Sequence, residues 1–301
     1  MKSHPGTAVQ AVGSNISETD SVGSGLFAIG PSCPLRYRPS MPHAQINGQK
    51  VYFEDTGGDG PPVILAHGFL MDHEMFAPQV AALRDTHRVI TWDERGFGLT
   101  EFDGQPFPYW DSAADCIGLL DHLGIGRAVV GGMSQGGFLS LRVALAAPDR
   151  VRGLILLDTQ AGVDDDETRA GNDAMNHVWL TEGPASGLAD VVASIIIDDA
   201  AHSPAWIAKW NDRPKEAFRE PYQCLTGRDD ITERLSEITC PALVVHGKDD
   251  TAITMDRAEI LAQGLVGCSG VVRVSGAHAA NLTNPEPVNA AVLAFLAGLP
   301  G

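Results

Sequence analysis

The chain has 301 residues, of which 44% are hydrophobic and 20% are charged, as expected for a globular protein with a buried core. Its 38 acidic and 21 basic residues give a formal net charge of −17, and no cluster of Lys or Arg appears. These properties argue against binding to nucleic acid or to an anionic membrane, and they favour a small neutral or apolar partner. No run approaches the roughly 18 apolar residues of a membrane-spanning helix. Nothing in the sequence indicates an oligomeric state.

The five cysteines form an odd, scattered set without a close Cys-x-x-Cys pair: Cys33, Cys116, Cys224, Cys240 and Cys268. This spacing predicts neither a disulfide framework nor a zinc site. We therefore expect reduced thiols in a cytoplasmic protein, with no metal and no cofactor.

Residues 1–40 differ in composition from the rest of the chain. They are rich in Ser, Gly and Pro and lack sustained periodicity, so we expect a largely disordered N-terminal extension. Lys2 is followed by Pro5 and by the polar stretch 14–20 rather than by the continuous apolar segment of a secretory signal. This agrees with a cytoplasmic location.

Strands and helices alternate through the first half of the chain. Residues 50–56 alternate as a half-buried strand, and residues 62–67 and 87–92 predict short buried strands. Helical periodicity occupies residues 74–83 and 109–123 between and after them. This order predicts a mostly parallel sheet with helices on both faces.

A Gly-x-Ser-x-Gly sequence, residues 132–136, follows the β-branched run 128–130 and precedes the helix-period segment 138–145. A serine in this strand–turn–helix context is held on a sharp turn, which makes Ser134 a candidate nucleophile. Gly132 and Gly136 leave space that side chains would otherwise fill.

This stretch resembles the nucleophile turn of the α/β-hydrolase superfamily, and the resemblance extends over about residues 41–299. His67-Gly68-Phe69 is similar to the family's His-Gly-x loop, which implies that the backbone N–H groups of Phe69 and Gln135 form an oxyanion hole. We expect His67 itself to be structural. The segment 93–100 resembles the family's Asp-x-Arg-Gly-x-Gly-x-Ser loop, with Thr100 at the last position, and a structural role is expected for it.

The same resemblance implies an acid and a base in the last third of the chain. The loop after the predicted strand 241–246 supplies the acid, and the position three residues past its Gly is Asp250. Asp249 is the neighbour most easily confused with it, and Asp158, at the end of the predicted strand 151–158, is a reserve candidate. The loop after the predicted strand 270–274 implies His278 as the general base.

The pattern changes between the two halves of the predicted core, 41–158 and 238–301. Residues 159–237 lack strand alternation and look like the helical cap that many members of this superfamily carry. The acidic patch 164–167 is interpreted as a solvated helix start. Five residues are candidates for a substrate pocket: Leu70, Met133, Trp179, Trp206 and Trp210.

A serine hydroxyl needs a base to attack a carbonyl, and the base needs an acid that fixes its tautomer. The order Ser134, Asp250, His278 is the order this superfamily uses. We therefore expect a serine hydrolase that cleaves a small carboxylic ester or lactone. Carbon–carbon bond hydrolysis, a perhydrolase-type activity and a non-catalytic ligand receptor on the same fold remain alternatives.

Overall fold

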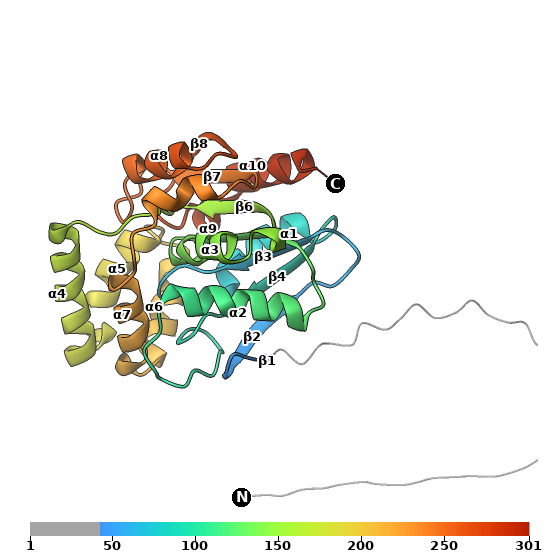
Figure 1. Cartoon of the computed structure of the whole chain (residues 1–301). Coiled ribbons are helices and arrows are strands. Elements are labelled where there is room, and N and C mark those ends of the chain that lie inside the picture. The colour runs from blue at the N-terminus through green and yellow to red at the C-terminus, as the bar shows by residue number, and fades with distance from the viewer. Residues whose placement is uncertain (1–42, 301) are drawn as a thin grey trace, which may run out of the picture. The chain divides into compact units, whose positions relative to one another are not determined.

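The computed structural model describes residues 43–300, so the expected disorder of residues 1–40 lies outside the described part of the chain. A sheet of eight strands runs in the order β1-β2-β4-β3-β5-β6-β7-β8 (Figure 1). The β1–β2 and β2–β4 pairs are antiparallel, and all other neighbours are parallel. The strands are β1 (His43–Ile46), β2 (Gln49–Asp55), β3 (Pro62–Ala66), β4 (Arg88–Trp92), β5 (Ala128–Met133), β6 (Val151–Leu157), β7 (Ala242–Gly247) and β8 (Cys268–Val274).

The central strands are buried on both faces because their alternate side chains enter two different cores. On β5, Val130 belongs to one hydrophobic cluster and Val129 belongs to the other. On β6, Leu156 and Ile155 are divided in the same way. A strand with apolar residues on both faces needs helices on both sides of the sheet. The predicted fold class is therefore confirmed.

Helices cover the two faces as this pattern requires. Residues of α2, α3 and α8 belong to the first cluster, and residues of α1 and α10 belong to the second. The α-helices are α1 (Ala77–Leu83), α2 (Tyr109–His122), α3 (Gln135–Ala146), α4 (Asp166–Glu182), α5 (Leu188–Ile196), α6 (Ser203–Asp212), α7 (Arg219–Thr226), α8 (Met255–Gly264), α9 (Ala280–Thr283) and α10 (Pro285–Gly298). Short 3-10 helices are η1 (His73–Phe76), η2 (Pro148–Arg150), η3 (Pro184–Ser186), η4 (Lys215–Phe218) and η5 (Thr232–Glu237).

A group of helices is inserted between β6 and β7, at the left of Figure 1. It contains α4 to α7, and the described residues in this interval form no strand. Helix α4 begins directly after Asp165, because this residue accepts a hydrogen bond from the Thr168 N–H and so caps the first turn. Two acidic residues in that turn, Asp166 and Glu167, favour the positive end of the helix dipole.

Strand β1 was not expected from the sequence. It pairs with β2 through a tight turn at Asn47 and Gly48, whose φ angles are 47° and 84°. Two consecutive positive φ angles are typical of the turn that joins the strands of a hairpin, and Asn-Gly is its favoured sequence. The Asn-Gly pair was therefore a usable signal for this hairpin.

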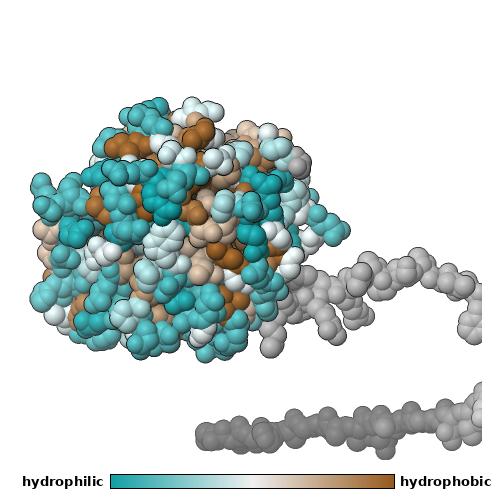
Figure 2. All heavy atoms as spheres, in the orientation of Figure 1, coloured by the Kyte–Doolittle hydropathy of each residue, from teal (hydrophilic) through white to brown (hydrophobic). Residues whose placement is uncertain are grey.

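Within residues 43–300, no helix combines the length and apolar character needed to cross a bilayer. On the face shown in Figure 2, hydrophilic and hydrophobic side chains are interspersed. The large hydrophobic side chains that remain exposed are scattered over several elements: Leu99, Val191, Ile260, Val266, Val272 and Leu293.

Candidate active site

Ser134 sits on a strained turn between the end of β5 and the start of α3. Its backbone has φ 52° and ψ −115°, an uncommon conformation for any residue other than Gly. The Ser134 N–H donates to the Leu157 carbonyl (2.9 Å), and the Thr159 hydroxyl donates to the Ser134 carbonyl (2.7 Å). These contacts with β6 and with the segment just after it hold the turn in place.

The close approach of this turn to β3 explains the glycines around the serine. A Cβ atom at Gly136 would lie 1.9 Å from the Ala66 carbonyl oxygen, and one at Gly132 would lie 2.6 Å from the same atom. No side chain fits at either position without moving β3 or α3. The two glycines therefore let the serine turn pack directly against β3.

His278 and Asp250 meet at the carboxyl edge of the sheet. Asp250 lies in the loop after β7, and His278 lies in the loop after β8. The His278 Nδ1 atom is 2.7 Å from Asp250 Oδ2, and both side chains are buried. Because a carboxylate only accepts hydrogen bonds, His278 donates from Nδ1, which leaves its Nε2 atom free to take a proton.

Asp250 is held by its own loop. Its Oδ1 atom accepts hydrogen bonds from the N–H groups of Ala252 (2.9 Å) and Ile253 (3.0 Å). The imidazole of His246 also approaches, with its Nε2 atom 3.3 Å from Asp250 Oδ2, but it donates to the Ile253 carbonyl at 2.8 Å. Burial lowers the pKa of His246, so this histidine is a neutral structural side chain.

The other two candidate acids occupy different environments. Asp249 is exposed, and no hydrogen bond or ion pair joins it to His278. Asp158 is buried at the end of β6 and accepts a hydrogen bond from the Gly247 N–H (2.7 Å). Burial and the charge of Asp250 raise the pKa of Asp158 well above its ordinary value, so this environment favours the neutral form of Asp158.

Two backbone N–H groups border the serine turn. Gln135 is the first residue of α3, so its N–H has no acceptor within the helix. Phe69 follows Gly68 in the loop after β3, and within residues 43–300 neither the Phe69 nor the Gln135 N–H has a hydrogen-bond acceptor. Both N–H groups are therefore free to donate to an acceptor bound beside Ser134.

His67 fixes the loop that carries Phe69. Its Nδ1 atom lies 2.8 Å from the Gly68 carbonyl oxygen, and its Nε2 atom accepts a hydrogen bond from the Glu94 N–H (3.0 Å). Burial lowers the pKa of His67, in agreement with a neutral ring that donates from Nδ1 and accepts at Nε2. The imidazole thus ties the loop after β3 to the loop after β4.

The loop after β4 is organised by a second buried carboxylate. Asp93 accepts hydrogen bonds from the N–H groups of His73 (2.7 Å) and Leu99 (2.8 Å). The Thr100 hydroxyl donates to the Asp93 carbonyl at 2.6 Å, so threonine can serve at this last position of the motif. These hydrogen bonds hold the loop 93–100 in place, which agrees with the structural role expected for it.

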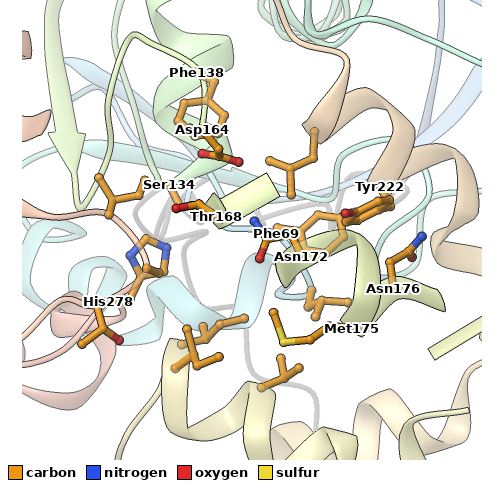
Figure 3. Close-up of a pocket in the computed structure, with 18 of the residues that line it drawn as sticks. Phe69, Ser134, Phe138, Asp164, Thr168, Asn172, Met175, Asn176, Tyr222 and His278 are labelled. Carbon is orange, nitrogen blue, oxygen red and sulfur yellow. The ribbon is translucent and has the colours of Figure 1, made fainter. Parts of the chain in front are cut away.

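A cavity of about 330 Å³ lies between the serine turn and the inserted helices. Ser134 and His278 both line it, and Figure 3 shows them close together on one side. Its apolar lining includes Leu70, Met133 and Trp179 from the expected set, together with Met175, Ile195 and Phe218. Its polar lining consists largely of Gln160, Asp164, Thr168, Asn172, Asn176 and Arg228.

Two of the expected pocket residues, Trp206 and Trp210, are not among the lining residues. The Trp210 indole N–H donates to the Leu70 carbonyl (2.6 Å), and its ring packs against Trp179. Trp206 is buried and lies under the ammonium group of Lys209. Trp210 therefore joins α6 to the loop after β3, and Trp206 is buried in the second hydrophobic cluster, so neither tryptophan lines the cavity.

Among residues 43–300, two clusters of mostly buried side chains combine the residue types that bind metals. In each, three carboxylate or imidazole groups come within 4.8 Å of one another: Asp72, His73 and Asp93, and Asp158, His246 and Asp250. The hydrogen bonds described above already account for the facing atoms of Asp93 and Asp250. Protein contacts therefore explain both clusters without a metal ion.

Comparison with known proteins agrees with this arrangement. The family model for the alpha/beta hydrolase fold matches residues 61–285, which is most of the chain. The chain belongs to the α/β-hydrolase family. As an α/β hydrolase it carries its serine turn, its buried acid and its histidine on loops at one edge of the sheet.

Several α/β hydrolases are similar over nearly their whole length. A thermophilic esterase from Thermogutta terrifontis is 30% identical with a TM-score of 0.75, covering 85% of this chain and 96% of the esterase. An enol-lactonase from Burkholderia xenovorans is 29% identical with a TM-score of 0.77, covering 85% and 100%. A protein from Azorhizobium caulinodans named "Putative carbamate hydrolase RutD" is 28% identical, covering 85% and 98%.

The sequence did not single out the polar lining of the cavity. Asp164 belongs to the acidic patch 164–167, for which the sequence indicates a solvated helix start, and Arg228 lies in no recognisable motif. Asp164 precedes the capping residue Asp165 and turns toward the cavity instead of the solvent. Asp164 faces the cavity, whereas the three acidic residues that follow it are exposed. One inward-facing residue in such a run produces no periodic pattern in the sequence.

Proposed function

We propose that this α/β hydrolase cleaves small carboxylic esters or lactones through an acyl-enzyme on Ser134. The proposal rests on the hydrogen bond between His278 Nδ1 and Asp250 Oδ2. His278 also lines the same cavity as Ser134. Serine, histidine and a buried carboxylate in this arrangement form the machinery of acyl transfer.

In this mechanism His278 Nε2 takes the proton of the Ser134 hydroxyl as the oxygen attacks the substrate carbonyl. The carbonyl oxygen becomes an oxyanion that accepts hydrogen bonds from the N–H groups of Phe69 and Gln135. The protonated His278 then gives its proton to the departing alkoxide, and the acyl group stays on Ser134. A water molecule, deprotonated by His278, releases the acid and restores the serine.

Asp250 has a supporting role in this scheme. Its carboxylate keeps the His278 proton on Nδ1 and stabilises the imidazolium that forms during each half-reaction. The hydrogen bonds from Ala252 and Ile253 keep its second oxygen occupied, so the other oxygen faces His278. Asp158 is less suited to this role, because its Oδ1 accepts from the Gly247 N–H, the His278 Nδ1 atom is paired with Asp250, and burial raises the pKa of Asp158.

The size and lining of the cavity favour small substrates. A volume of about 330 Å³ is at the lower end of the range for ligand pockets. The apolar side chains Leu70, Met133 and Trp179 suit an acyl or alcohol group with a hydrocarbon portion. Similar proteins named as an esterase, an enol-lactonase and a carbamate hydrolase support cleavage beside a carbonyl.

The direct test uses short-chain p-nitrophenyl esters and a panel of lactones. The purified protein should hydrolyse at least one ester or lactone, and Ser134→Ala should remove the activity. Ser194→Ala changes an exposed serine on α5 and should retain it. Turnover that survives in Ser134→Ala would contradict the mechanism. Tight ligand binding and phosphonate labelling of Ser134 without turnover of any substrate would favour a receptor instead.

A further inference from the structure

An ion pair is built into the wall of the cavity. The Arg228 Nη2 atom lies 2.7 Å from Asp164 Oδ1, and the two side chains are only 3% and 14% exposed. Asp164 belongs to the segment before α4, and Arg228 follows α7. The pair therefore joins two parts of the inserted helical region at the point where both border the cavity.

The guanidinium of Arg228 is occupied by protein acceptors. Besides Asp164, it donates to the Leu225 carbonyl (2.7 Å) and to the Gly162 carbonyl (3.2 Å). Its planar group also stacks 4.7 Å from the centre of the Phe138 ring. Because its donors and one face are engaged, Arg228 is not a free cation for a bound anion.

The remaining polar lining is neutral. Of the Asp, Glu, Lys and Arg residues between positions 43 and 300, only Asp164 and Arg228 line the cavity. The polar side chains beside Asp164 come mainly from α4, where Thr168, Asn172 and Asn176 are spaced one turn apart (Figure 3). These groups offer hydrogen bonds without charge, so the ion pair leaves the wall with no net charge.

We propose that Asp164, by neutralising Arg228, restricts this cavity to ester or lactone substrates whose bound portion is uncharged. The inference rests on the proposed function and names the substrate class that the same site accepts. A substrate carboxylate would lose its hydration on entering and would meet a cation that Asp164 already holds. A neutral amide or hydroxyl group could instead bind the amide side chains of α4.

The test compares matched substrates that differ in one charge. The monoethyl esters of succinic, glutaric and adipic acid carry a free carboxylate, and their ω-amide counterparts are nearly isosteric and neutral. Hydrolysis is followed in a pH-stat, and the ratio of kcat/KM for half-ester to kcat/KM for ω-amide ester is determined. The wild-type protein should prefer the ω-amide esters. A wild-type preference for the half-esters would overturn the inference.

The charge of Asp164 is then removed with the isosteric change Asp164→Asn. The ratio should rise by about tenfold or more for the chain length that reaches Arg228, and the rise should shrink at high salt. Asp164→Glu keeps the charge and should retain a ratio near that of the wild type. The double variant Asp164→Asn, Arg228→Gln has no charged side chain at these two positions. Its ratio of kcat/KM values should therefore not show the rise seen in Asp164→Asn.

Asp165→Asn is the matched control because it removes the neighbouring carboxylate, which is 60% exposed and does not line the cavity. Asparagine also serves at a helix cap, so α4 should keep its start. Its ratio should stay at the wild-type value. An unchanged ratio in Asp164→Asn, or an equal rise in Asp165→Asn, would overturn the inference. Thermal melts identify variants that fail to fold, and the wild-type ratio then remains as an independent test.

Binding separates this inference from the proposed mechanism. In the Ser134→Ala background, dissociation constants for both substrate series are measured by quenching of Trp179, which lines the cavity. If Asp164→Asn shifts the binding ratio but the Ser134-bearing protein never turns over, the mechanism fails and the substrate class stands. If esters are turned over but neither ratio shifts, the substrate class fails and the mechanism stands.

Discussion

The Nδ1 atom of His278 lies 2.7 Å from the Oδ2 atom of Asp250, although 28 positions separate the two residues. Two loops at the carboxyl edges of β7 and β8 bring them together. Since these strands are parallel neighbours, the loops after them lie side by side. The pairing is therefore a direct result of the strand order.

Replacing each candidate acid with asparagine should separate their roles. Asp250→Asn should lower kcat roughly 10³–10⁴-fold, because an amide can stabilise the wrong tautomer of His278 and cannot stabilise its imidazolium. Asp158→Asn and Asp249→Asn should each change kcat less than about tenfold. Steady-state kinetics on a p-nitrophenyl ester gives the three values. An active Asp250→Asn enzyme beside an inactive Asp158→Asn enzyme would assign the acid to β6.

Replacing Gly136 with any larger residue should lower both stability and activity for steric reasons. Gly136→Ala brings a methyl group against the Ala66 carbonyl, so α3 must move away from β3 and from the loop that carries Phe69. We expect a loss of about 1–3 kcal/mol in the free energy of unfolding, measured by urea denaturation, together with a lower kcat.

Gly171→Ala provides the control for this change. Gly171 lies on the exposed side of α4, and a Cβ atom there meets nothing within 4 Å. Alanine should therefore stabilise the helix by roughly 0.5–1 kcal/mol. Equal effects of the two substitutions would contradict the packing explanation of the serine turn.

Glu94 should make the folded protein less stable as pH rises above about 4.5. Its side chain is fully buried, and burial raises its pKa well above the ordinary value of 4.5. Above about pH 4.5 the unfolded chain releases a proton that the folded state retains, so stability falls as pH rises toward the raised pKa. Below pH 4.5 both states hold the proton and the difference vanishes.

Glu94→Gln removes this titration. Relative to the wild type, the variant should gain stability as pH rises from about 4.5 toward the raised pKa, by at most about 1.4 kcal/mol per pH unit. Urea denaturation across this range measures the difference, and Glu182→Gln, at the end of α4, controls for the loss of one acidic residue. A difference that stays constant with pH, or that falls as pH rises, would show that Glu94 is not protonated in the folded protein.

Much of the fold could be predicted because its strands carry alternating or continuous apolar runs of the right length. The expected strands 62–67 and 151–158 agree with β3 and β6 to within one residue. The hairpin strand β1 was missed because its four residues are too few to show a period, although Asn47-Gly48 marked the turn. Short edge strands depend on their partner more than on their own sequence.

The residues of the candidate site also fall into two groups, those that a local motif predicts and those that only the packing of the helices places. Ser134, Asp250 and His278 could be predicted because each lies in a short motif after a strand, and the strand order fixes where each motif lies. Asp164 and Trp210 depend on how the inserted helices pack, and no local pattern indicates that packing. Asp164 therefore looked like a solvated acid, and Trp210 looked like a pocket residue.

The most direct test of the central claim is to trap the acyl-enzyme. The protein is mixed with a short-chain p-nitrophenyl ester, quenched in acid within the first turnovers, digested and analysed by mass spectrometry. The mechanism predicts one acyl group, located on the peptide that contains Ser134 and absent from the Ser134→Ala variant. Ester hydrolysis with the acyl group on another residue, or hydrolysis at an undiminished rate in Ser134→Ala, would contradict it.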